Sequence, residues 1–242
     1  LYQLYLLGKG KYRVKVRAAQ VVIKVKDVFQ LVKLSLGAIG QYIIATSSWI
    51  FLVWVVTSLG EEVVAGYTIA IRIIMFALLP AWGLANAAAT LVGQNLGAKQ
   101  PDRAERSAWV VGIANMVFLG LVSVIFIAIP DAFIGFFVNA GNEPVVMSSG
   151  ITCLRVVSFG FLVYALGQVM VNSINGAGDT ATPVWINFVA FWLMEIPLAY
   201  LFTKMLDLQI NGVCYAILIA ETALTLIAMA VFRRGKWKLK VV

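Results

Sequence analysis

The strongest constraint on this fold is a series of six long apolar segments separated by short polar stretches. The segments cover residues of about 33–57, 65–92, 108–129, 149–174, 183–203 and 212–232. Each reaches the roughly 20 residues that an α-helix needs to cross a bilayer core of about 30 Å. A surface helix of a soluble protein keeps a polar stripe at the helical period, whereas these segments are apolar almost all round. The pattern predicts an all-α integral membrane protein with a bundle of six transmembrane helices.

The composition excludes a soluble domain and several kinds of chemistry. Hydrophobic residues make up 62% of the chain and charged residues 12%, against roughly 45–50% and about 25% in globular proteins. There is no histidine, which removes histidine-based catalysis, haem ligation and most zinc sites. The two cysteines, Cys153 and Cys214, are too few and too far apart in sequence for a disulfide framework or a CxxC metal site. We expect no metal, no cofactor and no enzyme activity, because an enzyme in the membrane would need convergent nucleophiles, metal ligands or acid pairs.

The basic residues indicate the direction of the spans. Sixteen of the 19 basic residues lie in the N-terminal arm, in the loop after the second span and in the C-terminal tail. The alternate loops, around 61–62, 131–143 and 204–207, hold one basic residue and five acids. Loops rich in Lys and Arg stay in the cytoplasm, so both ends of the chain are expected there, in a plasma membrane such as the bacterial inner membrane. The net charge of +8 is therefore a topology signal and does not indicate a nucleic-acid partner.

The chain divides into three parts. Residues 1–32 are interpreted as the end of a preceding helix followed by a basic cytoplasmic linker, residues 33–232 as the six-helix lobe, and residues 233–242 as a basic cytoplasmic tail. The first seven residues, LYQLYLL, are typical of the last turns of an apolar helix, and the first residue is not methionine. We therefore expect the sequence to be a fragment of a longer protein.

Two loops are rich in helix-ending and helix-starting residues. In the first, residues 91–104, glycines end the second span and Pro101 suits the first turn of the next helix. In the second, residues 175–183, Gly176 and Gly178 end the fourth span, and Thr182 can cap the fifth with Pro183 at its first position. Neither loop follows a strand or has P-loop spacing, which argues against a phosphate site.

These loops and three segments within the spans resemble the multidrug and toxic compound extrusion (MATE) transporters. The segments are Ala70–Ile73, Leu79–Leu84 and Ile196–Tyr200. The loop residues that carry the resemblance are Gly93, Gln94, Asn95, Gly97, Gly176, Gly178, Asp179, Thr180 and Pro183. With the basic linker and tail, the resemblance covers nearly the whole chain.

The resemblance implies a fold and a function. Transporters of this family have twelve helices in two lobes of six, with a substrate cavity between the lobes, and this chain resembles the second lobe. It implies secondary active efflux of multiple drugs or other small organic cations by antiport with H⁺ or Na⁺. The expected partners are the lipid bilayer, the substrates and the missing first lobe. The alternatives are a lipid-linked oligosaccharide flippase of the same superfamily and a non-transporting membrane interaction subunit.

Four ionisable residues lie inside the expected spans: Arg72, Arg155, Glu195 and Glu221. Such residues cost about 2.5–3.5 kcal/mol each at the bilayer centre. At about 1.5 Å per residue all four lie roughly 9–14 Å deep. One interpretation is that the two bases and two acids form ion pairs that hold helices together. The other is that a carboxylate, most simply Glu195, faces the central cavity and attracts a cation.

Uncharged polar residues form a second pattern within the spans. Tyr164, Gln168, Asn172 and Asn175 recur at i, i+4, i+8 and i+11, on one face of the fourth span. Such side chains must turn toward another helix or a water-filled cavity, so they are either contacts between helices or cavity lining, and the family resemblance favours the cavity. The same cavity is expected to include Gln41 and Ser48 of the first span and Asn86 of the second. Apolar contacts to drug-like cations are expected from Met75, Phe76, Trp82, Phe161, Phe188 and Trp192.

The chain departs from the sodium-coupled branch of the family. That branch carries carboxylates on the first and fourth helices of this lobe, and alignment through the second loop places those positions at about Ala45 and Tyr164. The resemblance therefore does not carry that cation site over, and coupling is expected to use an acid of the first lobe or Glu195. Pro80 and Pro197 lie within spans and predict kinks.

Overall fold

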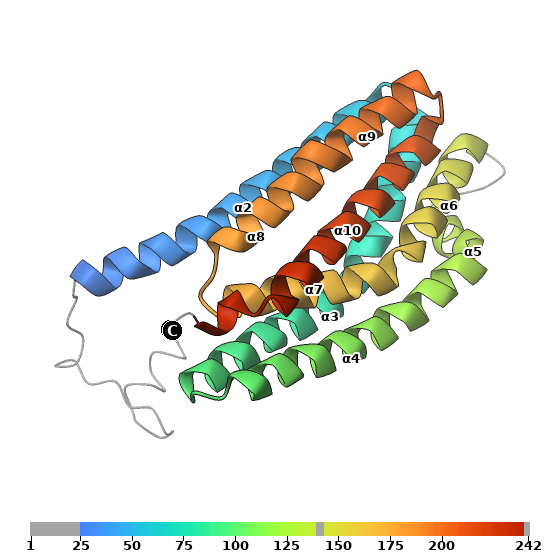
Figure 1. The fold of residues 1–242 in the computed structure, drawn as a ribbon. Helices are drawn as coiled ribbons and strands as arrows, with labels where there is room; N and C mark the ends of the chain where they lie inside the picture. The colour runs from blue at the N-terminus through green and yellow to red at the C-terminus, as the bar shows by residue number, and fades with distance from the viewer. Residues whose placement is uncertain (1–24, 139–142, 240–242) are drawn as a thin grey trace, which may run out of the picture. The chain divides into compact units, whose positions relative to one another are not determined.

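The fold is helical throughout its described part. The computed structural model describes residues 25–138 and 143–239, and every regular element in these two ranges is a helix (Figure 1). The prediction of an all-α chain is confirmed. Most of the expected N-terminal linker, residues 1–24, and the last three residues of the tail lie outside the described residues.

Most of the predicted spans correspond to long helices. Five helices are long and apolar enough to cross a membrane, and a bent pair supplies a sixth candidate span. The elements are α2 (Val25–Thr57), α3 (Glu61–Gly97), α4 (Pro101–Ala128), α5 (Pro130–Gly135), α6 (Pro144–Phe159), α7 (Phe161–Gly176), α8 (Ala181–Asn187), η2 (Phe188–Glu195), α9 (Ile196–Tyr200), η3 (Leu201–Met205), α10 (Gln209–Arg233) and η4 (Lys236–Leu239).

The chain separates into two compact units, residues 1–36 and residues 37–242. The described part of the first unit is the beginning of α2, which starts at Val25, ahead of the span start expected at 33. The apolar part of α2 that could cross a membrane runs from Ser35 to Thr57. The second unit contains all other helices and the site considered below.

The fourth span is broken, which the sequence pattern did not predict. Helices α6 and α7 meet at Gly160 with a bend of 57°. Just before the break, the Ser158 hydroxyl donates to the Leu154 carbonyl, and the Ser158 carbonyl accepts a hydrogen bond from Ser123 of α4. A serine that bonds back to its own helix favours a bend. The Ser158 carbonyl is satisfied by the Ser123 side chain, so the helix can lose its backbone hydrogen bond to that carbonyl at the break.

The fifth span contains two π-helical stretches, η2 and η3, on either side of α9. Pro197, the second residue of α9, cannot donate a backbone hydrogen bond and its ring crowds the preceding turn. A wider turn before the proline relieves that crowding, so the irregularity expected at Pro197 takes the form of π-helix. Pro80, in contrast, lies inside α3, which continues as a single helix.

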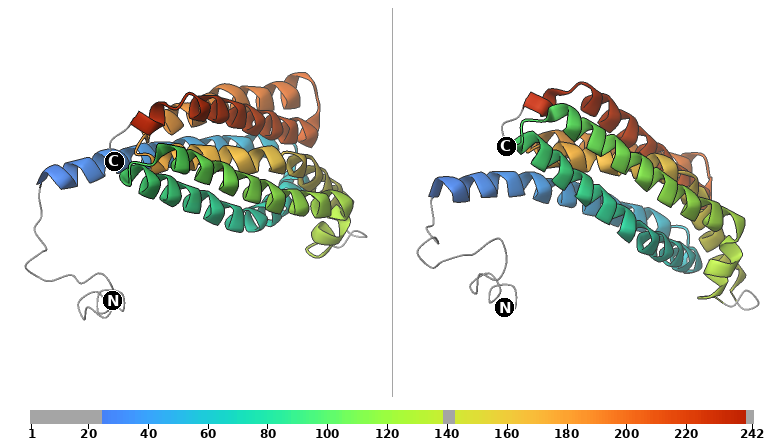
Figure 2. Two further views of the ribbon diagram at one scale, coloured as in Figure 1. Left: turned by 60° about the horizontal axis from the view of Figure 1, so that its bottom comes forward. Right: turned by 90° about the horizontal axis from the view of Figure 1, so that it is seen from below.

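Small residues allow the helices of the second unit to approach closely. Helices α3 and α4 lie side by side along much of their length (Figure 2). A Cβ added at Gly176 of α7 would lie 2.2 Å from the Ala89 carbonyl oxygen of α3. Close backbone approach at small residues is typical of helix packing in membranes, where water does not drive association.

Candidate functional site: a polar region inside the helical lobe

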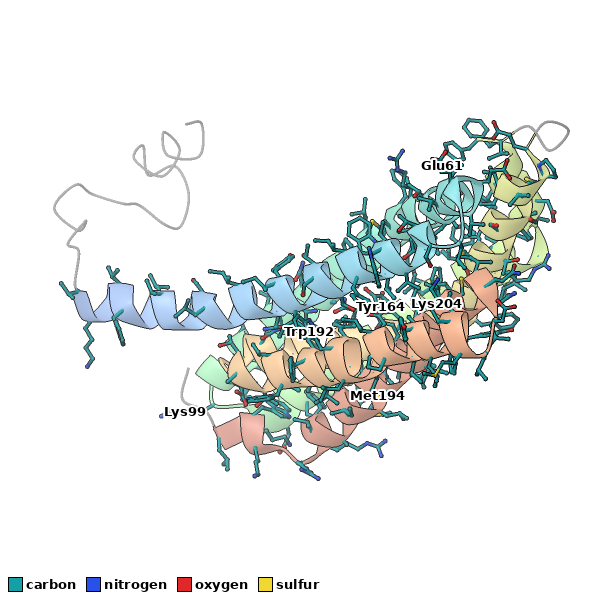
Figure 3. All side chains as sticks on the ribbon, turned by 90° about the horizontal axis from the view of Figure 1, so that it is seen from above. Glu61, Lys99, Tyr164, Trp192, Met194 and Lys204 are labelled. Carbon is teal, nitrogen blue, oxygen red and sulfur yellow. The ribbon has the colours of Figure 1, made fainter. Side chains whose placement is uncertain are left out.

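The polar face expected on the fourth span lies on α7 and forms a hydrogen-bonded series. Trp82 Nε1 of α3 and Gln168 Nε2 both donate to the Tyr164 hydroxyl, at 2.7 and 2.8 Å. Asn172 Nδ2 donates to the Gln168 carbonyl at 2.9 Å and lies 3.3 Å from its side-chain oxygen. We call Trp82, Tyr164, Gln168 and Asn172 the polar ladder. Tyr164 and Trp192 lie in the middle stretch of the helices, away from Lys99 and Glu61 at the ends of α3 (Figure 3).

The fourth polar residue on this face, Asn175, bonds to α2 instead. Its amide and that of Gln41 exchange two hydrogen bonds of 3.1 Å each. A reciprocal amide pair satisfies a donor and an acceptor on both side chains, which is what side chains in a membrane interior require. Gln41 therefore connects the beginning of the second unit to the last turn of α7.

Ser48 and Glu195 form the most buried polar contact of the candidate site. The Ser48 hydroxyl lies 2.6 Å from Glu195 Oε2 and 3.3 Å from the Phe191 carbonyl. Both side chains are buried, Ser48 with 1% and Glu195 with 5% of its surface exposed. One residue before Ser48, the Ser47 hydroxyl accepts a 3.1 Å hydrogen bond from Trp192 Nε1. Two consecutive serines thus hold η2 against α2.

The ion pairs that one of the two interpretations expects among Arg72, Arg155, Glu195 and Glu221 are not found among the described residues. In the part of the chain that the structure describes, the ion pairs are those of Lys238 with Asp102 and Glu105. Arg72 and Arg155 are exposed on α3 and α6, where a long side chain can extend toward the membrane surface. Equal depth along the span does not imply the same side of a helix, and sequence spacing alone could not distinguish these cases.

The two acids lie near each other, without an arginine. Glu221 of α10 is half-buried and close enough to Glu195 and to the Tyr164 hydroxyl for electrostatic interaction. The acids therefore join the polar ladder in one region built from α2, α3, α7, η2 and α10. Neither acid forms an ion pair among the described residues, and an unpaired carboxylate inside a membrane is costly. Among the described residues, no group of three or more metal-ligating side chains is present.

Not every predicted site residue belongs to this region. Asn86 lies on the exposed side of α3, and its backbone carbonyl accepts a bond from Thr90. Of the predicted apolar contacts, Phe161 is part of the core, whereas Met75, Phe76 and Trp192 are exposed. The residue whose role sequence reasoning missed is Trp82, which was expected to supply apolar contact and donates to Tyr164 instead.

The two loops differ in detail from the expected caps. Gly97 is the last residue of α3, and Pro101 begins α4 as expected. Gly93 lies inside α3, however, where an added Cβ would come 2.9 Å from the Gly176 carbonyl oxygen, so its role is the close packing of α3 against the end of α7. Thr182 does not cap α8. Its amide and hydroxyl instead donate to the Asp179 carboxylate, at 3.4 and 2.8 Å.

A shallow groove lies at the Lys99 end of α3 and α4, away from the polar region. It has a volume of about 580 Å³ and is lined mainly by Leu91, Val110, Val111 and the side chains of Arg103 and Arg106. No residue of the polar ladder lines this groove. That the ladder lines a substrate cavity therefore stays a prediction.

Comparison with protein families and with named relatives gives consistent matches. The family model MatE matches residues 38–201. A "Probable multidrug resistance protein NorM" of Pseudomonas putida is 27% identical over 243 residues, covering 99% of this chain and 50% of that protein. A protein of the same name from Thermotoga maritima is 23% identical over 186 residues, covering 76% of this chain and 39% of that protein. The chain thus spans half or less of the length of these relatives.

Solved structures show the same fold. A MATE structure in complex with MaL6 superposes with a TM-score of 0.91 at 18% identity, covering 99% of this chain and 54% of that chain. The MATE transporter ClbM, solved in complex with Rb⁺, gives a TM-score of 0.81 at 18% identity, covering 90% of this chain and 51% of that chain. The helical arrangement described above is therefore one that fills about half of these larger chains.

Proposed function

Because the chain belongs to the MatE family, we propose that it forms one six-helix lobe of a secondary transporter that exports small organic cations. The observation that carries the proposal is the family match across residues 38–201. Relatives about twice as long that are named as multidrug resistance proteins support it. The substrate cavity would form between this lobe and a second lobe of the same protein.

The Ser48–Glu195 contact is the proposed site of ion coupling in this lobe. Glu195 is buried, accepts a hydrogen bond from Ser48 and has no arginine partner in the described chain. An intramembrane carboxylate of this kind is costly unless it takes up a proton or a cation, and it is therefore a candidate for function. Ala45 and Tyr164 supply no carboxylate to the lobe, so the acids available nearby are Glu195 and Glu221.

The substrate is proposed to be a cation with an apolar body. Phe188 and Trp192 stack at 5.9 Å between ring centroids, and Trp192 has 44% of its surface exposed. An accessible aromatic face attracts a cation through its quadrupole. The amides of the polar ladder would add hydrogen bonds that orient the substrate.

The proposed location is a plasma membrane, with both ends of this chain on the cytoplasmic side. The basic residues of the 99–106 loop and of the tail support this direction, because such loops are retained in the cytoplasm. The coupling ion, H⁺ or Na⁺, would then enter from the opposite side as substrate leaves.

The test is dye extrusion by cells that express the full-length protein. Cells loaded with a cationic fluorescent dye should lose it faster than control cells while an ion gradient is present. A proton ionophore and a sodium ionophore are then added in separate experiments. The ionophore that abolishes the difference in extrusion rate identifies the coupling ion. Extrusion that survives collapse of both gradients would rule out coupled antiport, and no extrusion of any cationic dye would contradict the export function.

A further inference from the structure

Two thiols meet in the interior at a place that the proposed transport mechanism does not use. Cys153 of α6 and Cys214 of α10 have Sγ atoms 2.7 Å apart, although 61 residues separate them in sequence. Both are free cysteines with 0% exposure. Apolar carbon atoms in contact lie about 3.5–4.0 Å apart, so this approach is closer than ordinary packing. The distance between the two cysteines in the sequence argues against a disulfide, but the fold brings their sulfur atoms together.

The thiol pair lies at one end of a seam between the bent span and α10. Further along, a Cβ at Gly160 would lie 2.7 Å from Leu218 of α10, and one at Gly167 would overlap Thr225. The Thr225 hydroxyl donates to the Val163 carbonyl at 3.0 Å. Residues later in α6 and α7 contact residues later in α10. Helix α10 therefore runs parallel to α6 and α7. The thiols lie on the α6 side of the bend and the Thr225 contacts on the α7 side.

The geometry requires little movement for a covalent bond. A disulfide has an S–S length of about 2.03–2.05 Å, so the two Sγ atoms need to approach by only about 0.7 Å. Both thiols are fully buried in the hydrophobic core, whose buried residues include Tyr67. A water-soluble oxidant therefore has poor access, and the oxidant that we consider is one that dissolves in the bilayer.

We propose that Cys153 and Cys214 form a reversible disulfide that fixes α6 to α10 beside the bend at Gly160. The two thiols lose two protons and two electrons, and a single Sγ–Sγ bond forms. A lipid-soluble quinone accepts both electrons and both protons and becomes the quinol. A dithiol reductant reverses the reaction and restores the two S–H groups. In the reduced form only noncovalent contacts hold α6 against α10, whereas in the oxidised form the two helices cannot separate at this position.

The first experiment detects the bond directly. Membranes that contain the full-length protein are treated with a short-chain quinone, remaining thiols are blocked with N-ethylmaleimide in SDS, and the digest is analysed by mass spectrometry. We expect one peptide pair joined through Cys153 and Cys214, two hydrogens lighter than the separate peptides and absent after dithiothreitol. Maleimide on both cysteines after oxidation, with no joined peptide, would overturn the proposal.

Single replacements separate the disulfide from other oxidation products. In Cys153→Ala and Cys214→Ala the remaining thiol has no partner and should react fully with maleimide after the same treatment. Protection of that thiol in either variant would mean that oxidation does not need the pair, which contradicts the proposal. A thermal melt gives a second measurement: quinone should raise the melting temperature of the native protein and leave that of both variants unchanged. An equal rise in all three proteins would also count against it.

Discussion

At the residue scale, the orientation of Glu195 depends on Ser48 and on the wide turn before it. The Phe191 carbonyl accepts the backbone amide of Ile196, five residues ahead, in place of the usual four. The same carbonyl lies 3.3 Å from the Ser48 hydroxyl, which also reaches the Glu195 carboxylate. One serine therefore contacts both the backbone and the acid of η2. π-Helical turns are rare and frequent at functional sites, and here the turn ends on the buried acid.

Replacement of Glu195 by glutamine tests whether its charge matters. The glutamine amide would keep an oxygen for the Ser48 hydroxyl and remove the ionisable group, so the fold should persist. We expect Glu195→Gln in the full-length protein to lower ion-driven dye extrusion on the order of tenfold, equivalent to about 1.4 kcal/mol. The measurement is the initial extrusion rate as a function of pH and of sodium concentration.

Glu62→Gln is the matched control, because Glu62 is exposed at the start of α3. It should extrude dye at the native rate. If Glu195→Gln also keeps the native rate and the native dependence on pH and sodium, Glu195 serves only as a contact between helices.

Gly176 tests the close approach of α3 and α7. In Gly176→Ala the new Cβ would lie 2.2 Å from the Ala89 carbonyl oxygen, and the atoms it meets belong to the Ala89 backbone. Overpacking of this kind costs about 1–3 kcal/mol, so we expect the melting temperature of the protein in detergent to fall by several degrees.

Gly83→Ala is the control, since an added Cβ there meets no heavy atom within 4 Å. Its melting temperature should stay the same or rise, because alanine favours a helix by about 0.5–1 kcal/mol. Equal melting of both variants would contradict the packing argument.

At the element scale, the C-terminal tail docks on the Lys99 end of α4 and α10. Trp237 of η4 is buried, stacks on Phe232 with ring centroids 4.7 Å apart, and donates from Nε1 to the Phe232 carbonyl at 2.8 Å. Lys238 pairs with Asp102 and Glu105 in the first turns of α4. The carboxylates at this helix start also complement the helix dipole. The tail is thus held by an aromatic stack, by the hydrogen bond of Trp237 and by the ionic contact of Lys238 with two carboxylates.

The ionic contact predicts a dependence of stability on pH. The hydrogen bond and charge of Glu105, with a smaller contribution from Asp102, raise the pKa of Lys238 above its ordinary value. A raised pKa in the folded state stabilises that state fully below the ordinary lysine pKa, and this stabilisation is lost as the pH rises through the raised pKa. The difference in melting temperature between the native protein and Lys238→Met should therefore be constant from about pH 7 to about pH 9 and shrink above the ordinary lysine pKa of about 10.4.

The same difference should be small and fall with added salt, because exposed ion pairs contribute less than about 1 kcal/mol and are screened. Lys236→Met is the control, since Lys236 is exposed and should melt like the native protein at every pH. A Lys238→Met difference that persists unchanged at high pH would show that the lysine acts through packing and not through its charge.

Sequence reasoning could predict the regular parts of these elements better than their irregularities. Apolar length sets where a helix can cross a membrane, so the runs of residues now in α3, α4 and α10 were clear. The spacing of Tyr164, Gln168 and Asn172 likewise identified one face of α7, because helical geometry fixes which residues share a side. The bend at Gly160 had no proline to indicate it, and depends on Ser158 and on α4. Whether Arg72 and Arg155 meet an acid depends on which side of a helix faces its neighbours, which depth does not determine.

At the scale of the whole molecule, the polar region cannot be assigned to any one helix. Trp82 comes from α3, Tyr164 from α7, Ser48 from α2, Glu195 from η2 and Glu221 from α10. Each side chain needs the other helices to keep its polar atoms out of lipid. The site therefore requires the folded lobe, and the direction in which the lobe lies in the membrane decides which side ions reach first.

Single cysteines can determine that direction. In a Cys153→Ala, Cys214→Ala background of the full-length protein, cysteine is introduced at the exposed positions Glu62, Lys204, Arg103 or Lys236. A membrane-impermeant maleimide added to intact cells should label positions 62 and 204, and should label 103 and 236 only after the cells are opened. The basic residues near positions 103 and 236 are the physical reason. The reverse pattern would invert the proposed orientation.

The bent pair α6–α7 needs its own test, because a 57° bend fits either a broken span or a loop that re-enters the same side. At about 1.5 Å per residue, two helices of 16 residues have more than enough length to cross a core of about 30 Å. Glu143 precedes α6 and Ala181 begins α8, and both are exposed. Crossing predicts that the impermeant maleimide labels Glu143→Cys in intact cells and Ala181→Cys only in opened cells. Labelling of both from one side would instead make the pair re-entrant. That result would leave five crossings among the described helices, an odd number, against the two cytoplasmic ends that the basic residues indicate.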